Sequence, residues 1–206
     1  MLFPEVTFPQ TVGWAKNQYR DPYKRHMGIQ EIEWRVREAN GHQVAFLNLN
    51  YFNTLCLMHC LLDRAMRSLS IVYDGGILPL LQELREPFEN TTKRIGGRGG
   101  NIRILVLAPL CIKQTDRIKH KICTFGKAVE VRIKTPQPSI SLRYAVIADS
   151  RDYRVEESHG RTTDKSPADA FSSKAVFNGR KGLWLQNQFD VLFELNDSKY
   201  ILKEHK

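Results

Sequence analysis

The stretch that most constrains the fold is 140–155, with the sequence ISLRYAVIADSRDYRV. The almost entirely apolar run Leu142–Asp149 is typical of a strand covered on both faces, as in the centre of an α/β sheet. A polar turn then separates it from a second extended segment, Tyr153–Glu156. The charged residues Arg143 and Asp149 lie inside the first strand or at its lip, where a charge needs a partner, a ligand or water.

Helix and strand signals alternate around this hairpin, which predicts the α/β class. The sheet is expected to be mixed and mainly parallel, with helices flanking both faces. It should contain Ile71–Tyr73, Ile102–Ala108 and Val129–Ile133 beside the hairpin strands. Weaker strand signals are found at 44–49 and at 174–177, the second as an edge strand. The predicted helices are 27–40, 53–69, 78–88, 113–124 and 182–195.

The chain divides into an N-terminal extension with a short helix (1–48), an α/β domain (49–198) and a tail (199–206). Because Pro4, Pro9 and Pro22 interrupt the extension, its beginning is expected to run extended over a surface. No apolar run approaches the roughly 18 residues that span a bilayer, and the N-terminus lacks a signal pattern. The four cysteines are not spaced as a disulfide framework. These features predict a cytoplasmic protein with no membrane partner.

The net charge of +9 is concentrated in one region. Between Lys93 and Lys134 there are eleven Lys or Arg residues against two acidic ones, and the rest of the chain is balanced. A basic excess of this kind predicts an anionic partner, DNA or RNA. Phe125 is the only aromatic residue there, so a stacking platform for single strands is not expected. The predicted nucleic-acid contacts are Arg94, Arg98, Lys113, Arg117, Lys119 and Lys121.

Two short patterns admit a structural and a functional interpretation. Cys56 and Cys60 flank His59, but zinc sites usually show a CxxC pair or a second, distant ligand pair. The thiols are therefore predicted to be core residues. The GGRGG run at 96–100 leads into a strand, whereas a phosphate loop connects a strand to a helix. It is predicted to be a plain connector. We expect neither a metal nor another cofactor.

The order of elements from residue 102 onward resembles a known family. NIRILVLAP, VEVRI, LRYAVIAD and YRV are followed by KAVFNGRKGLWLQNQFDVLFEL. This series is similar to the phospholipase D-like domain at the C-terminal end of archaeal transcription regulators, whose closing helix carries a motif like Leu192–Leu195. The resemblance covers about Leu49–Leu195. It implies a phospholipase D-like fold and a sensor or regulatory role, usually without catalysis.

Active members of that superfamily carry His-x-Lys, with an aspartate four residues beyond the lysine. Counted back from Asp149, the two positions fall on Leu142 and Tyr144 or, one residue on, on Arg143 and Ala145. Neither choice supplies the nucleophilic histidine, so the resemblance implies that phosphodiester hydrolysis is lost. A cleft at the strand ends is expected to bind a ligand instead. Its predicted residues are Arg143, Asp149, Tyr73 and Asp74.

Three functions stay open at this point. The first is a non-catalytic sensor or regulatory domain that binds a small anionic ligand or a protein and forms a homodimer. The second is a nucleic-acid-binding module that uses the basic 93–134 region. The third is a divergent phosphodiesterase or nuclease that uses His159 with Arg161 and Lys165. The sequence does not identify the ligand.

Overall fold

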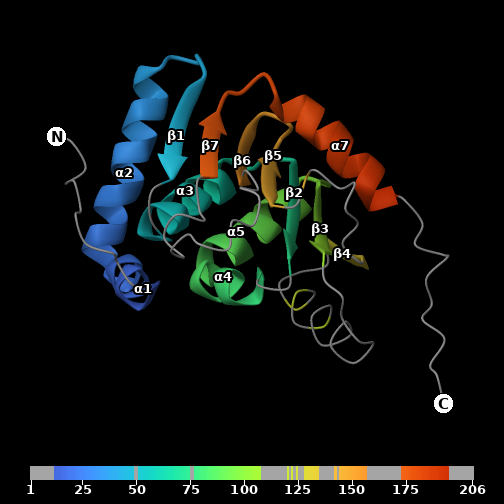
Figure 1. Cartoon of the computed structure of the whole chain (residues 1–206), viewed down its shortest axis with the longest axis horizontal. Coiled ribbons are helices and arrows are strands. Elements are labelled where there is room, and N and C mark those ends of the chain that lie inside the picture. The colour runs from blue at the N-terminus through green and yellow to red at the C-terminus, as the bar shows by residue number, and fades with distance from the viewer. Residues whose placement is uncertain are drawn as a thin grey trace, which may run out of the picture.

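The computed structural model describes residues 12–48, 51–74, 77–107, 128–134, 144–156 and 173–194, together with residues 120, 122, 124 and 142. The described part of the chain forms a seven-stranded sheet in the order β1-β7-β6-β5-β2-β3-β4 (Figure 1). The strands are β1 (Val44–Asn48), β2 (Ser68–Asp74), β3 (Asn101–Leu107), β4 (Val129–Lys134), β5 (Ala145–Ala148), β6 (Asp152–Glu156) and β7 (Ser173–Phe177).

The predicted α/β class is confirmed, and all five main predicted strands lie in this one sheet. The expectation of a mainly parallel sheet is wrong. Only β2–β3 and β3–β4 pair in parallel, whereas the other four pairs are antiparallel. The β5–β6 hairpin was expected to be antiparallel, because a connection of three residues cannot cross over to a parallel neighbour. The difference lies in the pairs β2–β5, β6–β7 and β1–β7, which are antiparallel as well.

The strand β7 was expected at an edge of the sheet, and this is wrong as well. It lies between β1 and β6, with Val44 opposite Phe177 and Tyr153 opposite Val176. The covering strand β1 comes from the N-terminal extension, so the described part of that extension contributes to the same sheet. Because β1 and β7 are far apart in the sequence, the local sequence pattern could not show that they pair.

Helices cover both faces of the sheet, as predicted. The larger layer contains α1 (Val12–Arg20), α2 (Pro22–Glu38), α3 (Tyr51–Arg64), α4 (Ile77–Glu83) and α5 (Arg85–Gly96), whereas α7 (Gly182–Glu194) covers the other face. Neighbouring strand residues alternate between the two cores, because successive side chains point to opposite faces. Ile71 and Ile104 thus pack in the larger core, and Val72 and Leu105 pack under α7.

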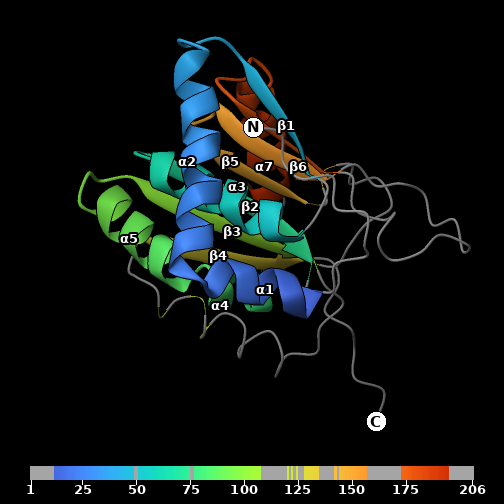
Figure 2. The same ribbon diagram turned by 90° about the vertical axis from the view of Figure 1, so that its left-hand side faces the viewer.

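The N-terminal helices differ from the sequence expectation. The chain is helical from Val12, where it was expected to run extended. Pro22 begins α2 instead of interrupting it, because the first helical position needs no N–H donor. Asp21 caps this helix by accepting from the backbone N–H groups of Tyr23 and Lys24 at 3.0 and 3.3 Å. Figure 2 shows α2 as the outermost helix on its side of the molecule, in front of α3.

Other helix boundaries are close to the predicted ones. The predicted helix 53–69 begins earlier, at Tyr51, and ends at Arg64. The predicted helix 78–88 is divided at Leu84 into α4 and α5. The predicted helix 113–124 lies mostly outside the described residues. None of the helices that the structure describes is long and apolar enough to cross a bilayer.

The helix α7 is held on the sheet by an apolar face and by basic side chains at its end. Leu185, Phe189 and Phe193 are buried under it. Its C-terminal carbonyl groups accept hydrogen bonds from the sheet, since Lys134 Nζ donates to the Leu192 oxygen and Arg132 Nη1 donates to the Phe193 oxygen, each at 2.7 Å. Cations at this position also offset the negative end of the helix dipole.

Two aromatic residues of α7 give a test of this packing. Phe189 is fully buried, so Phe189→Ala should lower the free energy of unfolding by about 3–5 kcal/mol. Trp184 on the same helix is 57% exposed, so Trp184→Ala should change the free energy of unfolding by less than about 0.5 kcal/mol. Urea unfolding followed by circular dichroism measures both. Equal losses in the two variants would contradict this placement of α7.

Candidate functional site

Five loops meet along one edge of the sheet, where β2 and β3 begin and β5 and β7 end (upper edge in Figure 1). They are the connections α2–β1, β7–α7, β5–β6, α3–β2 and α5–β3. Backbone contacts and polar side chains join each loop to the next, in the same order as their strands lie in the sheet. We refer to this set as the loop row.

The centre of the loop row is held by Asp149, at the end of β5. Its Oδ2 accepts from the Met66 N–H, and its Oδ1 accepts from the N–H groups of Arg67 and Ser68, each at 2.8 Å. Asp149 and Ser150 both have positive φ angles, of 52° and 55°. Aspartate tolerates this left-handed conformation better than most residues. The β5–β6 turn is thereby fixed to the α3–β2 loop.

Close backbone approach fixes the loops on either side. The Asn101 N–H donates to the Arg67 oxygen at 3.1 Å, and a Cβ atom at Gly100 would collide with the same oxygen. A Cβ atom at Gly182 would likewise collide with the Ser150 oxygen at the start of α7. Only glycine allows these approaches.

Asn178 and Asp152 join the remaining two loops. The Asn178 N–H donates to Asp152 Oδ1 at 2.8 Å, and the Asn178 amide donates to the His42 oxygen in the α2–β1 loop at 3.3 Å. Asp152 is only 1% exposed, and its Oδ2 accepts from Arg64 Nε at 2.8 Å. The backbone and Arg64 therefore compensate the buried carboxylate.

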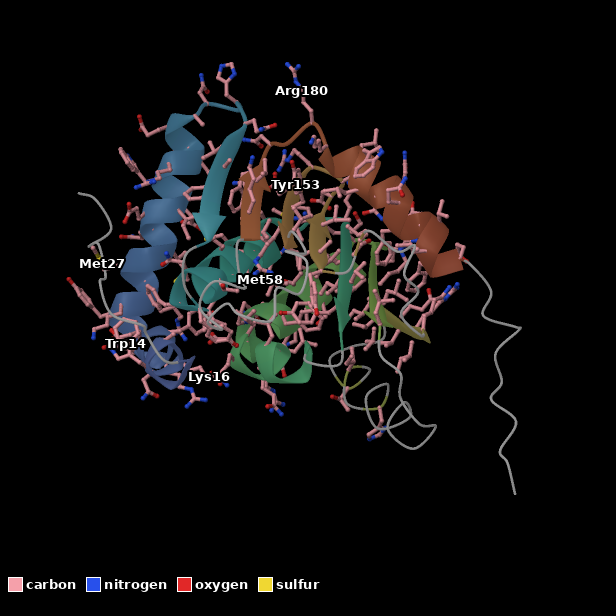
Figure 3. All side chains as sticks on the ribbon, viewed as in Figure 1. Trp14, Lys16, Met27, Met58, Tyr153 and Arg180 are labelled. Atoms are coloured by element: carbon pink, nitrogen blue, oxygen red, sulfur yellow. The ribbon has the colours of Figure 1, made fainter. Side chains whose placement is uncertain are left out.

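Exposed basic side chains project from four of these loops. In the order of the sheet they are Arg180 and Lys181, Arg151, Arg67 and Arg98. Figure 3 shows Arg180 pointing away from the body of the molecule. With strands about 4.8 Å apart, the row from β7 to β3 spans about 19 Å.

The charge of this row is poorly compensated by acidic groups. Arg67, Arg180 and Lys181 form no ion pair with any residue that the structure describes. Arg151 Nε donates to Asp152 Oδ1 at 3.1 Å, but that oxygen already accepts from Asn178. Asp149 is engaged by three N–H groups. The edge therefore presents a net positive line to the solvent.

The sequence-predicted ligand residues are not brought together. Tyr73 lies near the end of β2, where its ring packs edge-on against Tyr144 with 5.3 Å between centroids. Asp149 lies beside Ser68, at the beginning of β2, and five residues of extended strand separate the two ends by about 17 Å. Arg143 and the side chain of Asp74 lie outside the described residues.

The predicted nucleic-acid contacts are divided in a similar way. Arg98 lies in the loop row, with its Nη1 3.0 Å from Met66 Sδ. Arg94 has a packing role, because its Nε donates to the Ala65 oxygen at 2.9 Å and its Nη2 donates to the Leu62 oxygen. The other four predicted contacts, Lys113, Arg117, Lys119 and Lys121, lie outside the described residues.

Sequence reasoning did not find the other cations of the loop row. Arg67, Arg151 and the pair Arg180–Lys181 are separated by long stretches of chain, and none lies between Lys93 and Lys134. The pair sits in a short NGRKG turn, which was the one local signal available.

A second polar cluster lies between α1 and α3. The Tyr19 hydroxyl is 2.6 Å from His59 Nδ1, and His59 Nε2 is 3.2 Å from Asp63 Oδ2. Cys56 and Cys60 are buried beside it in the larger core, as predicted. Burial raises the pKa of the Cys56 thiol to about 12 and also raises the pKa values of Cys60 and Tyr19. These groups stay protonated at neutral pH, so they do not supply a nucleophile.

No group of three or more His, Cys, Asp or Glu side chains within the described ranges is placed to hold a metal ion. The loop row itself offers a line of guanidinium and ammonium groups. Such groups bind phosphate oxygens, arginine often in a bidentate manner.

Comparison with known proteins gives a distant structural likeness. No protein-family model matches the sequence, and no curated protein does. One similar solved structure is TrmBL2, an archaeal chromatin protein described as showing a novel mode of DNA binding. It has 13% identity and a TM-score of 0.48 over 87% of this chain and 64% of that one. This chain thus spans less than two thirds of that protein.

Two further solved structures come from bacteria. Nuc of Salmonella typhimurium, a phospholipase D family member, has 12% identity and a TM-score of 0.47, with 73% of this chain and 93% of that one covered. Phosphatidylserine synthase of Haemophilus influenzae has 11% identity and a TM-score of 0.45, with 74% and 38% covered.

The role of Asp149 can be tested by its removal. Asp149→Ala leaves three N–H groups without their acceptor, so we expect the free energy of unfolding to fall by about 2–4 kcal/mol. Amide hydrogen exchange at Met66, Arg67 and Ser68 should become faster. Glu86 is an exposed carboxylate on α5, and Glu86→Ala serves as the control. A loss no larger than that of the control would contradict a structural role for Asp149.

Because the thiols of Cys56 and Cys60 and the phenol of Tyr19 are buried, we expect the protein to lose stability at alkaline pH. Because the folded protein raises the pKa of Cys56 from 9.0 to about 12, it binds more protons than the unfolded chain between these values. The free energy of unfolding should therefore fall as the pH rises above about 9. Urea unfolding at a series of pH values measures this. The decline should be smaller in Cys56→Ala. Equal declines in this variant and in the parent protein would contradict a contribution from the Cys56 thiol.

Proposed function

We propose that this protein binds the phosphate backbone of a nucleic acid along the loop row. The observation that supports this is the convergence of exposed cations from four separate loops, beside two carboxylates already engaged inside the protein. An ordinary solvated surface would intersperse charges of both signs. A line of one sign favours an extended polyanion.

The length of the row fits several phosphate groups. One DNA strand presents a phosphate about every 3.4 Å along the helix axis, so about 19 Å corresponds to roughly five phosphates. Contacts of this kind position a protein on nucleic acid without reading its sequence. We therefore propose binding with little sequence preference.

The other functions have less support. A small-ligand site built from Tyr73 and Asp149 would need both residues in one cleft, whereas they lie at opposite ends of β2. A regulatory role and a cytoplasmic location stay predictions from the sequence. Arginine stays protonated and can hold phosphate without attacking it, so we propose binding without hydrolysis.

The test is a salt titration of binding to a short DNA duplex, followed by fluorescence anisotropy. About five phosphate contacts should give a slope of about −4.5 in the logarithm of affinity against the logarithm of salt concentration. The double variant Arg180→Ala/Lys181→Ala should weaken binding and make the slope less steep by about 2 units. Incubation of plasmid DNA with the parent protein should give no cleavage.

A matched control removes two cations elsewhere. Arg20 and Arg85 are exposed but pair with Glu83 and Glu89, each at 2.7 Å, outside the loop row. Arg20→Ala/Arg85→Ala lowers the net charge by the same amount and should leave the slope unchanged. Equal effects of the two double variants, or binding that does not respond to salt, would overturn the proposed site.

A further inference from the structure

The outer face of α2 carries a stripe of large exposed side chains. Tyr23, Met27 and Trp34 are 72%, 52% and 57% exposed, and Gln30 lies between them. Figure 3 shows Met27 pointing outward from the helix, with Trp14 of α1 nearby. A hollow of about 850 Å³ beside the stripe is lined in part by Trp14, Met27 and Trp34.

This stripe has the spacing of a helix-pairing seam. Its four members, 23, 27, 30 and 34, are separated by four, three and four residues, which is the a/d spacing of a two-helix coiled pair. The opposite side of α2 already packs inside the molecule, since Gly28, Ile32 and Val36 are buried. The helix therefore has two packing faces, and only one is covered by the part of the chain that the structure describes.

In one orientation, the polar side chains beside the seam would face complementary side chains on a second copy of α2. Lys24 and Glu31 lie on one flank, seven residues apart, and His26 and Glu33 lie on the other. If a second α2 lies antiparallel, with Tyr23 opposite Trp34 of the partner subunit, then Lys24 faces Glu31 of the partner subunit. On the other flank, His26 faces Glu33 of the partner subunit. Two-fold symmetry repeats each pair.

The alternative arrangements lack this match. A parallel pairing brings opposite flanks together. His26 then faces Glu31 of the partner subunit, but Glu33 faces Glu38 of the partner subunit, which is repulsive. The hollow beside the stripe is lined by the basic residues Lys24, Arg35 and Arg37 as well as by the carboxylates of Glu31 and Glu33, so this face lacks the single sign of charge that a nucleic acid favours. Glu31 also pairs with Arg35 within its own chain at 2.7 Å, so Lys24 of the partner subunit would share this carboxylate with Arg35.

We propose that two copies of this chain associate through α2, antiparallel and related by a two-fold axis, with the stripe 23–27–30–34 as the seam. This interface is separate from the loop row and does not depend on the proposed nucleic-acid binding. Tyr23 and Trp34 are the expected anchors, because large aromatic residues dominate such interfaces.

Sedimentation velocity over a range of protein concentrations tests the association. The parent chain should be dimeric, and Trp34→Ala should weaken the dimer by at least about 30-fold, the effect of losing an interface anchor. Trp184→Ala is the control, since Trp184 is equally exposed but lies on α7. Circular dichroism should show that both variants remain folded. A monomeric parent chain, or a dimer that Trp34→Ala leaves unchanged, would overturn the proposal.

A charge exchange tests the orientation. His26→Glu places a carboxylate opposite Glu33 of the partner subunit and should weaken the dimer by about 10-fold. Glu33→Arg should also weaken it, by removing the partner of His26. The double variant His26→Glu/Glu33→Arg should recover the affinity of the parent chain. Residues seven apart on one helix lie about 10 Å from each other, so recovery cannot arise within one chain. Failure of the double variant to recover would overturn the antiparallel register.

Discussion

The loop row depends on the carboxylate of Asp149 more than on any other group. This one side chain accepts from three consecutive backbone N–H groups and so fixes the start of β2 to the end of β5. Backbone N–H groups that precede a strand need an acceptor, and a carboxylate satisfies several of them at once. The same residue that the sequence suggests as a ligand contact therefore serves the fold, because its carboxylate oxygen atoms are engaged by backbone N–H groups of the same chain.

The balance of charge at this edge follows from that arrangement. Asp152 is held by Arg64, Arg151 and the Asn178 N–H, so the second carboxylate of the β5–β6 turn is also engaged. The cations of the neighbouring loops are then left facing solvent with little compensation. The positive character of this edge follows from its five exposed Arg and Lys side chains against two carboxylates, whose oxygen atoms already accept hydrogen bonds from groups of the same chain.

The helix α2 connects this edge to the outer side of the molecule. Its C-terminal end leads into the α2–β1 loop, whereas its exposed stripe lies opposite the buried residues Gly28, Ile32 and Val36. If two chains pair antiparallel through that stripe, the two loop rows point to opposite ends of the dimer. Two such rows would then engage separate nucleic-acid segments, because one duplex cannot lie along both ends.

The sequence by itself determined the α/β class, the five central strands and the closing helix, because apolar runs and their turns are local signals. It also placed Cys56 and Cys60 in the core. Only the tertiary structure decided strand direction and neighbours, since β1 and β7 pair across more than a hundred residues and chain pattern carries no information on such partners. The same holds for the site. Arg67, Arg151 and Arg180 become neighbours in one row only because their strands do, and Tyr73 and Asp149 are separated because a strand carries its two ends to opposite edges of the sheet.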